Sequence, residues 1–338
     1  MRAWQINNGF GIENLKQISL PSTTIKPDEI RVKIKSCSLN YRDLMVINGL
    51  YNPKQKLPLI PLSDACGEVI EVGSEITSFK LGDKVASCFF ADYLSDSVNT
   101  NPQESALGSP LDGVLCEERI FKSNGLVKIP SYLSFSQGAT LPCAALTAFN
   151  AIFNQSILKP GDHILIMGTG GVSIFALQFA NLLGLNSIVI SSSDEKLATC
   201  KTIGAKYLIN YQKNPHWHKE VMEITNGLGV ELVVEVSGAS TINQSLSVTK
   251  RNGHIAMIGI LGGNEATINL IPILMNNLHI NGIFVGSRVT FQQMNKVLAH
   301  TQIKPYIAKE FGFNEVPQAL NFMASKKHFG KICITIDN

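Results

Sequence analysis

From Gly161 onward, hydrophobic residues form short Val/Ile/Leu-rich runs that alternate with segments of helical length. Runs of this kind are typical of strands that are covered on both faces. We expect six strands, at His163–Met167, Ser187–Ser191, Lys206–Tyr211, Glu231–Val236, His254–Ile260 and His279–Val285. Between them we expect helices near Val172–Gly184, Asp194–Gly204, Pro215–Thr225 and Thr241–Lys250. This alternation predicts an α/β domain with a doubly wound parallel sheet.

Residues 1–125 have a different pattern, in which short strand-like runs such as Ile30–Ser36 and Gly67–Val72 are broken by Gly, Pro and Asn. Segments of helical length are few there, so we expect a β-rich domain. Beyond the parallel sheet, the pattern predicts a helix, a strand, a second helix and a last strand, at Phe291–His300, Tyr306–Phe313, Glu315–Ser325 and Lys331–Ile336. This tail either extends the parallel sheet or returns to the first domain, and the pattern allows both.

Two segments depart from these patterns. Residues 163–193 contain no Asp, Glu, Lys or Arg, but Gly168, Gly170, Gly171 and Gly184 divide them into strand-like and helical pieces, so we do not expect a membrane span. Ala91–Gly113 is polar and too long for an ordinary connection, so we expect a mobile loop there. That loop is either a lid over the active site or a surface insertion without function.

Composition excludes several classes of function. The chain has 338 residues, enough for two domains, and 45% of them are hydrophobic, which excludes a disordered chain. A net charge of +3 without a basic block makes nucleic acid and membranes unexpected partners. Met1–Ile6 lacks the features of a secretory signal, so we expect a cytoplasmic protein. The seven cysteines lie 22 or more residues apart, which fits neither a disulfide framework nor a paired-cysteine metal site.

A glycine-rich turn follows the expected strand at His163–Met167. Its residues are Gly168, Thr169, Gly170, Gly171, Val172 and Ser173, and they open a predicted helix. Small residues let the backbone approach a pyrophosphate, whose charge is held by free N–H groups at the helix N-terminus. We therefore expect Gly168, Gly170, Gly171 and Val172 to bind a dinucleotide. The alternative is a purely structural turn of an α/β sheet.

The end of the next strand indicates which dinucleotide is bound. Folds that prefer NAD place a carboxylate there for the ribose 2′-hydroxyl, but this strand ends in three serines, and Asp194 comes after them. Ser192 and Lys196 could instead bind a 2′-phosphate, which predicts NADP(H). Alternatively, Ser192 and Glu195 form the capping box of the following helix. Tyr211 either lies over the 2′-phosphate side of the adenosine or packs at the sheet edge.

Further motifs carry a resemblance over essentially the whole chain. They are Leu39–Asp43, Pro61–Gly73, Leu81–Val85, Ala139–Ala148, the glycine turn and His254–Gly259. In this order they resemble the medium-chain dehydrogenase/reductase superfamily, which joins a GroES-like β-rich catalytic domain to a Rossmann domain. The resemblance implies a catalytic domain at 1–125 and 305–338, and a dinucleotide-binding domain at 126–304.

Within that superfamily, the chain resembles the branch without zinc. Where zinc alcohol dehydrogenases carry a ligand Cys and the pair His-Glu, this sequence has Asn40 and the pair Ser63-Asp64, and among the ligands only Cys143 matches. All seven histidines lie at or beyond residue 163. Catalytic zinc needs three protein ligands, so we expect no metal.

The resemblance therefore implies an NADPH-dependent, zinc-independent oxidoreductase that transfers hydride to a quinone or an α,β-unsaturated carbonyl. It places Asn40 and Tyr41 near the nicotinamide, as donors to the substrate oxygen. It also places Thr147 and Val285 against the nicotinamide, the latter through its backbone. Asn40 and Tyr41 could instead be structural residues, and Thr147 and Val285 could be ordinary core residues.

Two other functions stay open, an NADP-dependent alcohol or aldehyde oxidoreductase and a non-catalytic cofactor-binding protein. The expected partner is a small-molecule substrate. The apolar strand at His279–Val285 resembles the edge through which members of the superfamily pair, so we also expect a homodimer.

Overall fold

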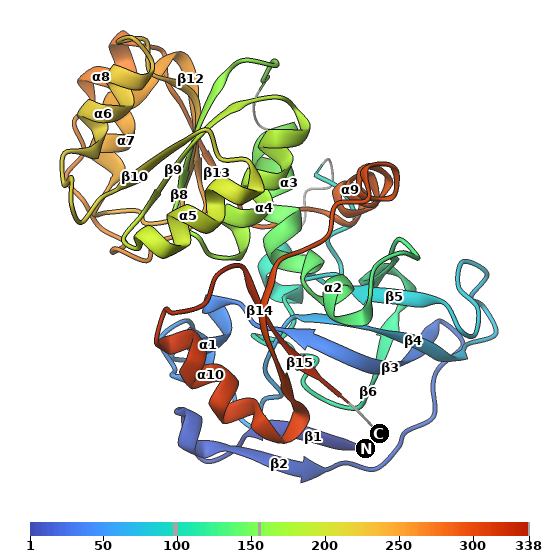
Figure 1. Ribbon diagram of the computed structural model, residues 1–338. Coiled ribbons are helices and arrows are strands. Elements are labelled where there is room, and N and C mark those ends of the chain that lie inside the picture. Colours follow the sequence, from blue (N-terminus) through green and yellow to red (C-terminus); the bar gives the residue numbers. More distant parts are fainter. Residues whose placement is uncertain (97–100, 155–156, 337–338) are drawn as a thin grey trace. The chain divides into compact units, whose positions relative to one another are not determined.

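The computed structural model describes residues 1–96, 101–154 and 157–336 (Figure 1). The chain divides into two compact units. The first unit contains Met1–Leu146 and Val285–Asn338, and the second contains Thr147–Phe284. The chain passes from the first unit to the second within α3 (Leu146–Phe149).

The first unit is built on β-strands. Its strands are β1 (Arg2–Ile6), β2 (Leu15–Ser19), β3 (Glu29–Ser38), β4 (Asp64–Val72), β5 (Lys84–Ser87), β6 (Glu118–Lys122), β7 (Leu126–Lys128), β14 (Ile307–Gly312) and β15 (Lys331–Thr335). β1 and β2 pair with each other, and the larger sheet has the order β14-β15-β3-β4-β5-β7, with β6 also paired to β3. This confirms the predicted β-rich domain.

The helices of the first unit are α1 (Tyr41–Ile47), α2 (Phe135–Ala139), α9 (Arg288–Thr301) and α10 (Val316–Ala324), with a π-turn at Leu141–Ala145 and single 3-10 turns at Ile12–Asn14, Pro102–Ser105, Ser123–Gly125 and Phe313–Glu315. The sequence explains the position of α10. Val316, Ala319, Leu320 and Met323 recur at helical spacing, and all four are buried in the core of this unit.

The C-terminal tail returns to the first unit, which answers the question that the pattern left open. β14 lies parallel to β15, and β15 pairs antiparallel with β3 through Cys333–Ser38 and its neighbours. Ile332, Cys333 and Ile334 are fully buried, so pairing with β3 removes the apolar face of this last strand from water.

The division into units also differs from the expected boundaries at 125 and 305, since residues 126–146 and 285–304 belong to the first unit. Hydrogen bonds explain the difference. The Nε of Arg288 on α9 donates to the Leu126 carbonyl of β7, and Asn295 Nδ2 donates to the Lys128 carbonyl. These contacts join segments more than 160 residues apart, which local pattern does not report.

One stretch of Ala91–Gly113 is packed, whereas much of the rest of its described part is exposed. Leu107 N donates to the Phe89 carbonyl, and the Arg42 guanidinium donates to the carbonyls of Leu107 and Ser109. Residues 105–109 are buried. Residues 105–109 are therefore part of the first unit's framework, so the expectation of a mobile loop is wrong for this stretch. Residues 97–100 of the segment lie outside the described residues.

The second unit contains the predicted doubly wound sheet. Its strands are β8 (His163–Met167), β9 (Asn186–Ser191), β10 (Tyr207–Asn210), β11 (Val230–Glu235), β12 (Thr249–Met257) and β13 (His279–Gly282), all parallel and in the order β10-β9-β8-β11-β12-β13. The helices are α4 (Gly171–Leu182), α5 (Asp194–Ile203), α6 (Trp217–Ile224), α7 (Ile242–Val248) and α8 (Ile271–Met275), with a π-turn at Asn150–Asn154. In such sheets, ligands bind at the carboxyl ends of the strands, where the strand order reverses. Here the order reverses between β8 and β11.

Residues 163–193 form β8, α4 and β9, as the glycines predict. Among the described residues, no helix is both long and apolar enough to cross a membrane. Helices α6 and α7 contribute Trp217, Val221, Ile242 and Leu246 to one apolar cluster with the strands. Burial of this kind on both faces explains why the strands read as continuous apolar runs.

Candidate active site

The glycine turn of the second unit has the geometry of a pyrophosphate cradle. β8 ends at Met167, Gly168 has a φ of +74°, and α4 begins at Gly171 with Gly170 as its N-cap. A Cβ added to Gly170 would meet no atom within 4 Å, so the backbone is open on that side. Ser173, in the third glycine position, is buried, and its Oγ donates to the Met167 carbonyl at 2.7 Å. A serine there ties the helix to the strand and leaves the turn open to a dinucleotide.

The end of β9 differs from one of the sequence alternatives. α5 begins at Asp194, and its N-cap is Ser193, whose Oγ accepts from Lys196 N at 3.3 Å. The alternative in which Ser192 forms the capping box is therefore wrong by one residue. The backbone turns into the helix after Ser193, so the Ser192 hydroxyl is not used as the cap.

Asp194, the first carboxylate after β9, is engaged by two neighbours. Its Oδ1 accepts from Asn210 Nδ2 at 2.7 Å, and its Oδ2 lies 2.5 Å from Lys213 Nζ. These hydrogen bonds hold the pKa of Asp194 below its ordinary value. The carboxylate is thus already neutralised by Lys213.

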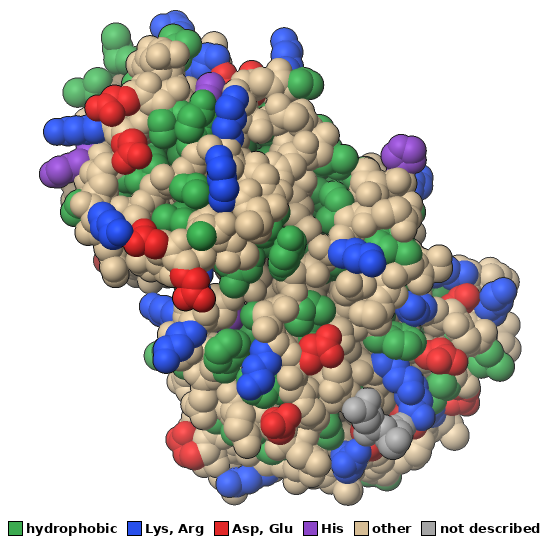
Figure 2. Space-filling view, viewed as in Figure 1, with side chains coloured by type: hydrophobic (Ala, Val, Ile, Leu, Met, Phe, Trp, Pro, Cys, Tyr) green, Lys and Arg blue, Asp and Glu red, His purple; other side chains and the backbone are tan. Residues whose placement is uncertain are grey.

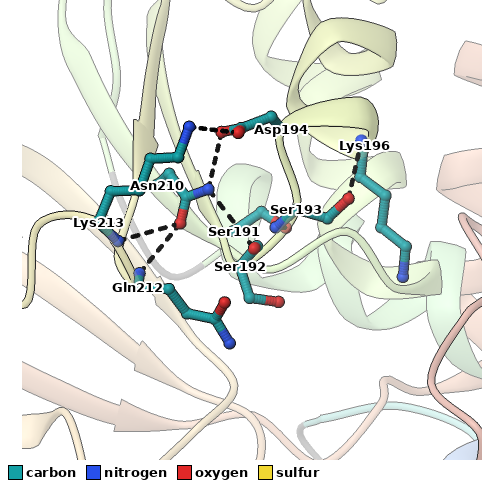
Figure 3. A network of polar contacts seen from close by, with 8 residues as sticks. All are labelled: Ser191, Ser192, Ser193, Asp194, Lys196, Asn210, Gln212 and Lys213. Atoms are coloured by element: carbon teal, nitrogen blue, oxygen red, sulfur yellow. Dashed lines mark hydrogen bonds and ion pairs between the residues drawn. The ribbon is translucent and has the colours of Figure 1, made fainter.

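Ser192 and Lys196 lie apart from that ion pair. In Figure 3 both side chains extend toward the lower part of the view, whereas Asp194, Asn210 and Lys213 form their network above. Lys196 is half-buried, and burial lowers the pKa of its ammonium against the opposing effect of Glu195. Such a lysine gains from an anionic ligand.

Tyr211 directly follows β10, and its N–H donates to the Ser191 carbonyl at 3.1 Å. The tyrosine is 41% exposed, so part of its surface is open to solvent. Its position beside the end of β9 is compatible with contact to a bound nucleotide.

In the first unit, Asn40 and Tyr41 stand where β3 gives way to α1. Asp43 closes this turn, because its Oδ2 accepts from Asn40 N at 2.8 Å and its own N–H donates to the Asn40 carbonyl. Asn40 is half-buried, and Tyr41 is 39% exposed. Asp43 therefore has the geometry of a residue that holds the turn.

A buried lysine completes this turn. Lys331, the first residue of β15, is 3% exposed, and its Nζ donates to Asn40 Oδ1 and to the Leu39 carbonyl, both at 2.6 Å. Asn40 Nδ2 is also buried, and it has no hydrogen-bond partner among the described residues. The amide of Asn40 is thus held at its oxygen, while its nitrogen is close enough to the Asp64 carboxylate to lower the pKa of Asp64.

Two buried carboxylates accompany this lysine. Asp64 accepts from Ser63 Oγ at 2.7 Å and from Cys143 N at 3.1 Å. Burial raises the pKa of Asp64, and the Lys331 ammonium opposes that rise. Burial likewise raises the pKa of Asp43 to about 7, with the Arg42 guanidinium as the main opposing charge. The turn therefore combines neutral donors with buried groups of both charges.

Zinc does not fit this arrangement. Among the described residues, no group of three or more His, Cys, Asp or Glu side chains could hold a metal ion. The amide of Asn40 and the hydroxyl of Ser63 are weak zinc ligands, and a cationic lysine already occupies the Asn40 oxygen. Burial also raises the pKa of the Cys143 thiol, which disfavours the thiolate that binds metal.

Thr147 and Val285 lie at the points where the chain changes unit, Thr147 in the second and Val285 in the first. Both are buried, with 3% and 4% exposure. Val285 has a φ of +61°, which is rare for a β-branched residue and costs about 1–3 kcal/mol. Strain of this kind is retained where the surrounding structure or a function requires it.

The sequence interpretation missed Lys331. A charged residue at the start of the apolar run Lys331–Ile336 is the one signal that could have drawn attention to it. Buried lysines are rare unless they are paired, but a lysine at a strand end normally reads as solvent-exposed.

A GroES-like unit and a Rossmann unit with an open glycine turn define a nicotinamide-dependent oxidoreductase of two-domain type. Comparisons with known proteins agree. Residues 26–131 match the alcohol dehydrogenase GroES-like domain, and residues 171–300 match the zinc-binding dehydrogenase family.

The chain belongs to the medium-chain dehydrogenase/reductase superfamily. It is 41% identical over 336 residues to a zinc-type alcohol dehydrogenase-like protein of Schizosaccharomyces pombe, covering 98% of this chain and 97% of that protein. It is 29% identical over 318 residues to a quinone oxidoreductase-like protein 2 homolog of Nematostella vectensis, covering 90% and 81%. A solved structure, a putative alcohol dehydrogenase of Sinorhizobium meliloti, superposes with a TM-score of 0.92 at 32% identity, covering 99% and 98%.

Membership of this superfamily indicates the general function of the protein. The protein is an oxidoreductase of this superfamily, whose folds bind a nicotinamide cofactor and whose members act on small molecules. The names of its relatives cover both alcohol dehydrogenase-like and quinone oxidoreductase-like proteins.

Proposed function

We propose that the protein is an NADPH-dependent, zinc-independent oxidoreductase that reduces quinones or α,β-unsaturated carbonyls. The observation that carries this proposal is the Asn40 turn. It holds an amide, a buried ammonium and hydroxyl groups where the zinc enzymes of the superfamily need metal ligands. Without a Lewis acid, the easier reaction is one in which charge develops on an oxygen away from the carbon that accepts hydride.

The residues of the turn have roles that suit this reaction. Bound NADPH supplies a hydride to the electron-poor carbon. Asn40 donates an Nδ2 hydrogen bond to the substrate oxygen, where the electron pair arrives, and this buried nitrogen has no partner at hydrogen-bond distance among the described residues. Tyr41, with its side chain 39% exposed, donates a hydrogen bond or the proton that completes the reduction, and water is the other source of that proton.

Cofactor preference rests on the end of β9. Because Ser193 is the N-cap of α5, the Ser192 hydroxyl is not used for capping, and Lys196 extends to the same side in Figure 3. A hydroxyl and an ammonium suit a 2′-phosphate, and the neighbouring carboxylate of Asp194 is held by Lys213. Gly168, Gly170, Gly171 and Val172 would hold the pyrophosphate, with Thr147, Tyr211 and Val285 completing the nucleotide site.

The test is consumption of reduced nicotinamide by protein that has been treated with a chelator. Quinones, enones, aldehydes and ketones are each offered with NADPH or NADH. We expect turnover with quinones or enones, with NADPH preferred and without effect of chelation. Activity that disappears with chelator and returns with zinc would refute the zinc-free mechanism, and comparable Kd values for NADPH and NADH would refute the cofactor assignment.

A second candidate function is NADP-dependent alcohol or aldehyde oxidation and reduction. The observation in its favour is the 41% identity to a protein named as alcohol dehydrogenase-like. Oxidation of simple alcohols by the chelator-treated protein, without turnover of quinones or enones, would favour this candidate. Tight NADPH binding without any turnover would instead indicate a non-catalytic role.

We also propose that two copies associate through β13. This strand is at the edge of the second unit's sheet, and Ile280 on it is 40% exposed. Nearby in sequence, Ile271 and Leu274 of α8 are 68% and 76% exposed. Figure 2 shows hydrophobic side chains at the upper left, where Figure 1 places α8. An unpaired sheet edge with exposed apolar side chains on and near it favours pairing with a second copy, and a monomeric mass by light scattering at micromolar concentration would refute this.

We place the protein in the cytoplasm. All seven cysteines are free thiols, a state that a reducing compartment preserves. Fractionation of cells that express the tagged chain tests this, and recovery in a secreted or oxidising compartment would refute it.

A further inference from the structure

The Asn40 turn depends on a residue from the far end of the chain. Lys331 is 291 residues from Asn40 in sequence, and β15 brings it there by pairing with β3, whose last residues lead into the turn. The backbone around the lysine is held in place, because Lys331 N donates to the Tyr306 carbonyl at 2.9 Å. Gly330 has a φ of +73°, and a Cβ there would lie 2.5 Å from the same carbonyl oxygen.

The ammonium decides how the Asn40 amide is oriented. Lys331 Nζ has only N–H groups to offer, so it selects the amide oxygen, and the opposite orientation would place N–H groups against N–H groups. The amide nitrogen must then lie on the other side. That nitrogen is buried and lies on the side of the Asp64 carboxylate, whose pKa it helps to lower. It has no partner at hydrogen-bond distance among the described residues, and of its two N–H groups one is left for a ligand when the other faces Asp64.

The Lys331 ammonium also makes Asn40 Nδ2 a stronger hydrogen-bond donor. A cation at the amide oxygen draws electron density away from the nitrogen, and hydrogen bonds in a low-dielectric site strengthen one another in this way. Lys331 also compensates for Asp64, which is fully buried. Without the lysine, the turn would hold two buried carboxylates with Arg42 as the principal compensating charge.

We propose that Lys331 is the positioning residue of the reaction, because it locks and polarises the Asn40 amide so that Nδ2 donates to the substrate oxygen. This rests on the proposed function. Lys331 does not touch the substrate.

The experiment is a double-mutant cycle with Lys331→Met, Asn40→Ala and the pair together. Because removal of one oxyanion donor lowers kcat by ~10²–10³-fold, we expect Asn40→Ala to fall toward that range and Lys331→Met to lose at least about tenfold. The double variant should be no slower than Asn40→Ala, since the lysine acts through the amide. The Kd for NADPH should not change in any of them, because the residues that bind its phosphates lie in the second unit.

An isotope effect separates positioning from loss of folded enzyme. NADPH deuterated at the transferred hydrogen should show a larger effect on kcat in Lys331→Met than in the wild type, since the hydride step has become slower. A variant that is merely less folded loses kcat without any change of the isotope effect. Lys84→Met is the matched control. Lys84 lies on β5, another strand of the same sheet, and its Nζ also donates to a backbone carbonyl, that of Leu133.

The possible outcomes distinguish the role of Lys331 from the proposed function. An unchanged kcat and isotope effect in Lys331→Met, or losses that add in the double variant, would overturn the role of Lys331 while the proposed function stands. A wild type without turnover on the substrate panel would overturn the proposed function, and this inference with it. Should Lys331→Met not fold, Lys331→Gln keeps a donor for Asn40 without the charge, and it enters the same cycle with an intermediate loss expected.

Discussion

Replacement of Lys196 by alanine should weaken the binding of NADPH and leave that of NADH nearly unchanged. Lys196 lies in the first turn of α5, on the side of the Ser192 hydroxyl and away from the Asp194–Lys213 ion pair (Figure 3). NADPH differs from NADH only by the 2′-phosphate. A loss confined to NADPH therefore reports contact with that group.

The expected size follows from the half-buried position of this lysine. Two opposite unit charges at about 4 Å attract by ~1 kcal/mol in water and by ~4 kcal/mol at an effective dielectric constant of 20. Hydrogen bonds to charged groups are worth ~1.5–3 kcal/mol by deletion. We expect a loss of about 2 kcal/mol, which is roughly a 30-fold increase in the Kd for NADPH.

The assay is a fluorescence titration of each nucleotide against wild type, Lys196→Ala and Lys213→Ala. Lys213 is the matched control, because it lies one strand away and its ammonium is held by Asp194. We expect Lys213→Ala to leave the ratio of the two Kd values unchanged. The reasoning would be refuted if Lys196→Ala weakened the binding of NADPH and NADH equally, or if it did not weaken the binding of NADPH.

Three further predictions concern the turns that build the site. Gly170→Ala should leave Tm unchanged, because the new methyl group meets no protein atom within 4 Å. It should weaken the binding of NADPH and of NADH equally, because the methyl group takes the space of the pyrophosphate, and unchanged Kd values would contradict this. Gly113→Ala should lower the free energy of unfolding by ~1–3 kcal/mol in urea, since its Cβ would lie 2.0 Å from the Leu62 carbonyl oxygen; wild-type stability would exclude that contact. Asp43 has its pKa raised to about 7 by burial, so the folded state binds the proton more tightly than the unfolded state, and stability falls as pH rises from about 4 to about 7. Asp43→Asn should reduce the difference in unfolding free energy between about pH 5 and about pH 8, and an unaltered difference would show that Asp43 does not titrate there.

The sequence alone determined the second unit to a large extent. The predicted strand at His163–Met167 has the bounds of β8, and the other five expected strands overlap β9 to β13. The inner strands β8, β9 and β11 are buried at nearly every position, so each appears as one continuous apolar run. The glycine turn could be found for a similar reason, because a tight strand-to-helix turn depends on residues that are adjacent in sequence.

Local pattern was less accurate at the end of β9. Three consecutive serines offer three possible caps, and the backbone, not the residue type, selects Ser193. The unit boundaries show the same limit. Residues 285–304 follow the parallel sheet in sequence, but the contacts of Arg288 and Asn295 with β7 hold them in the first unit.

Only the tertiary structure decided the chemistry around Asn40. The sequence singled out this residue through a motif, but its charged partner stands at the start of an apolar strand near the C-terminus. Pairing of β15 with β3 places Lys331 against the Asn40 amide, and burial of the lysine shields this contact from water. Hydrogen bonds between distant segments follow from the packing of strands, which no local pattern of residues records. The sequence therefore determined which elements form, and the packing determined which side chains meet.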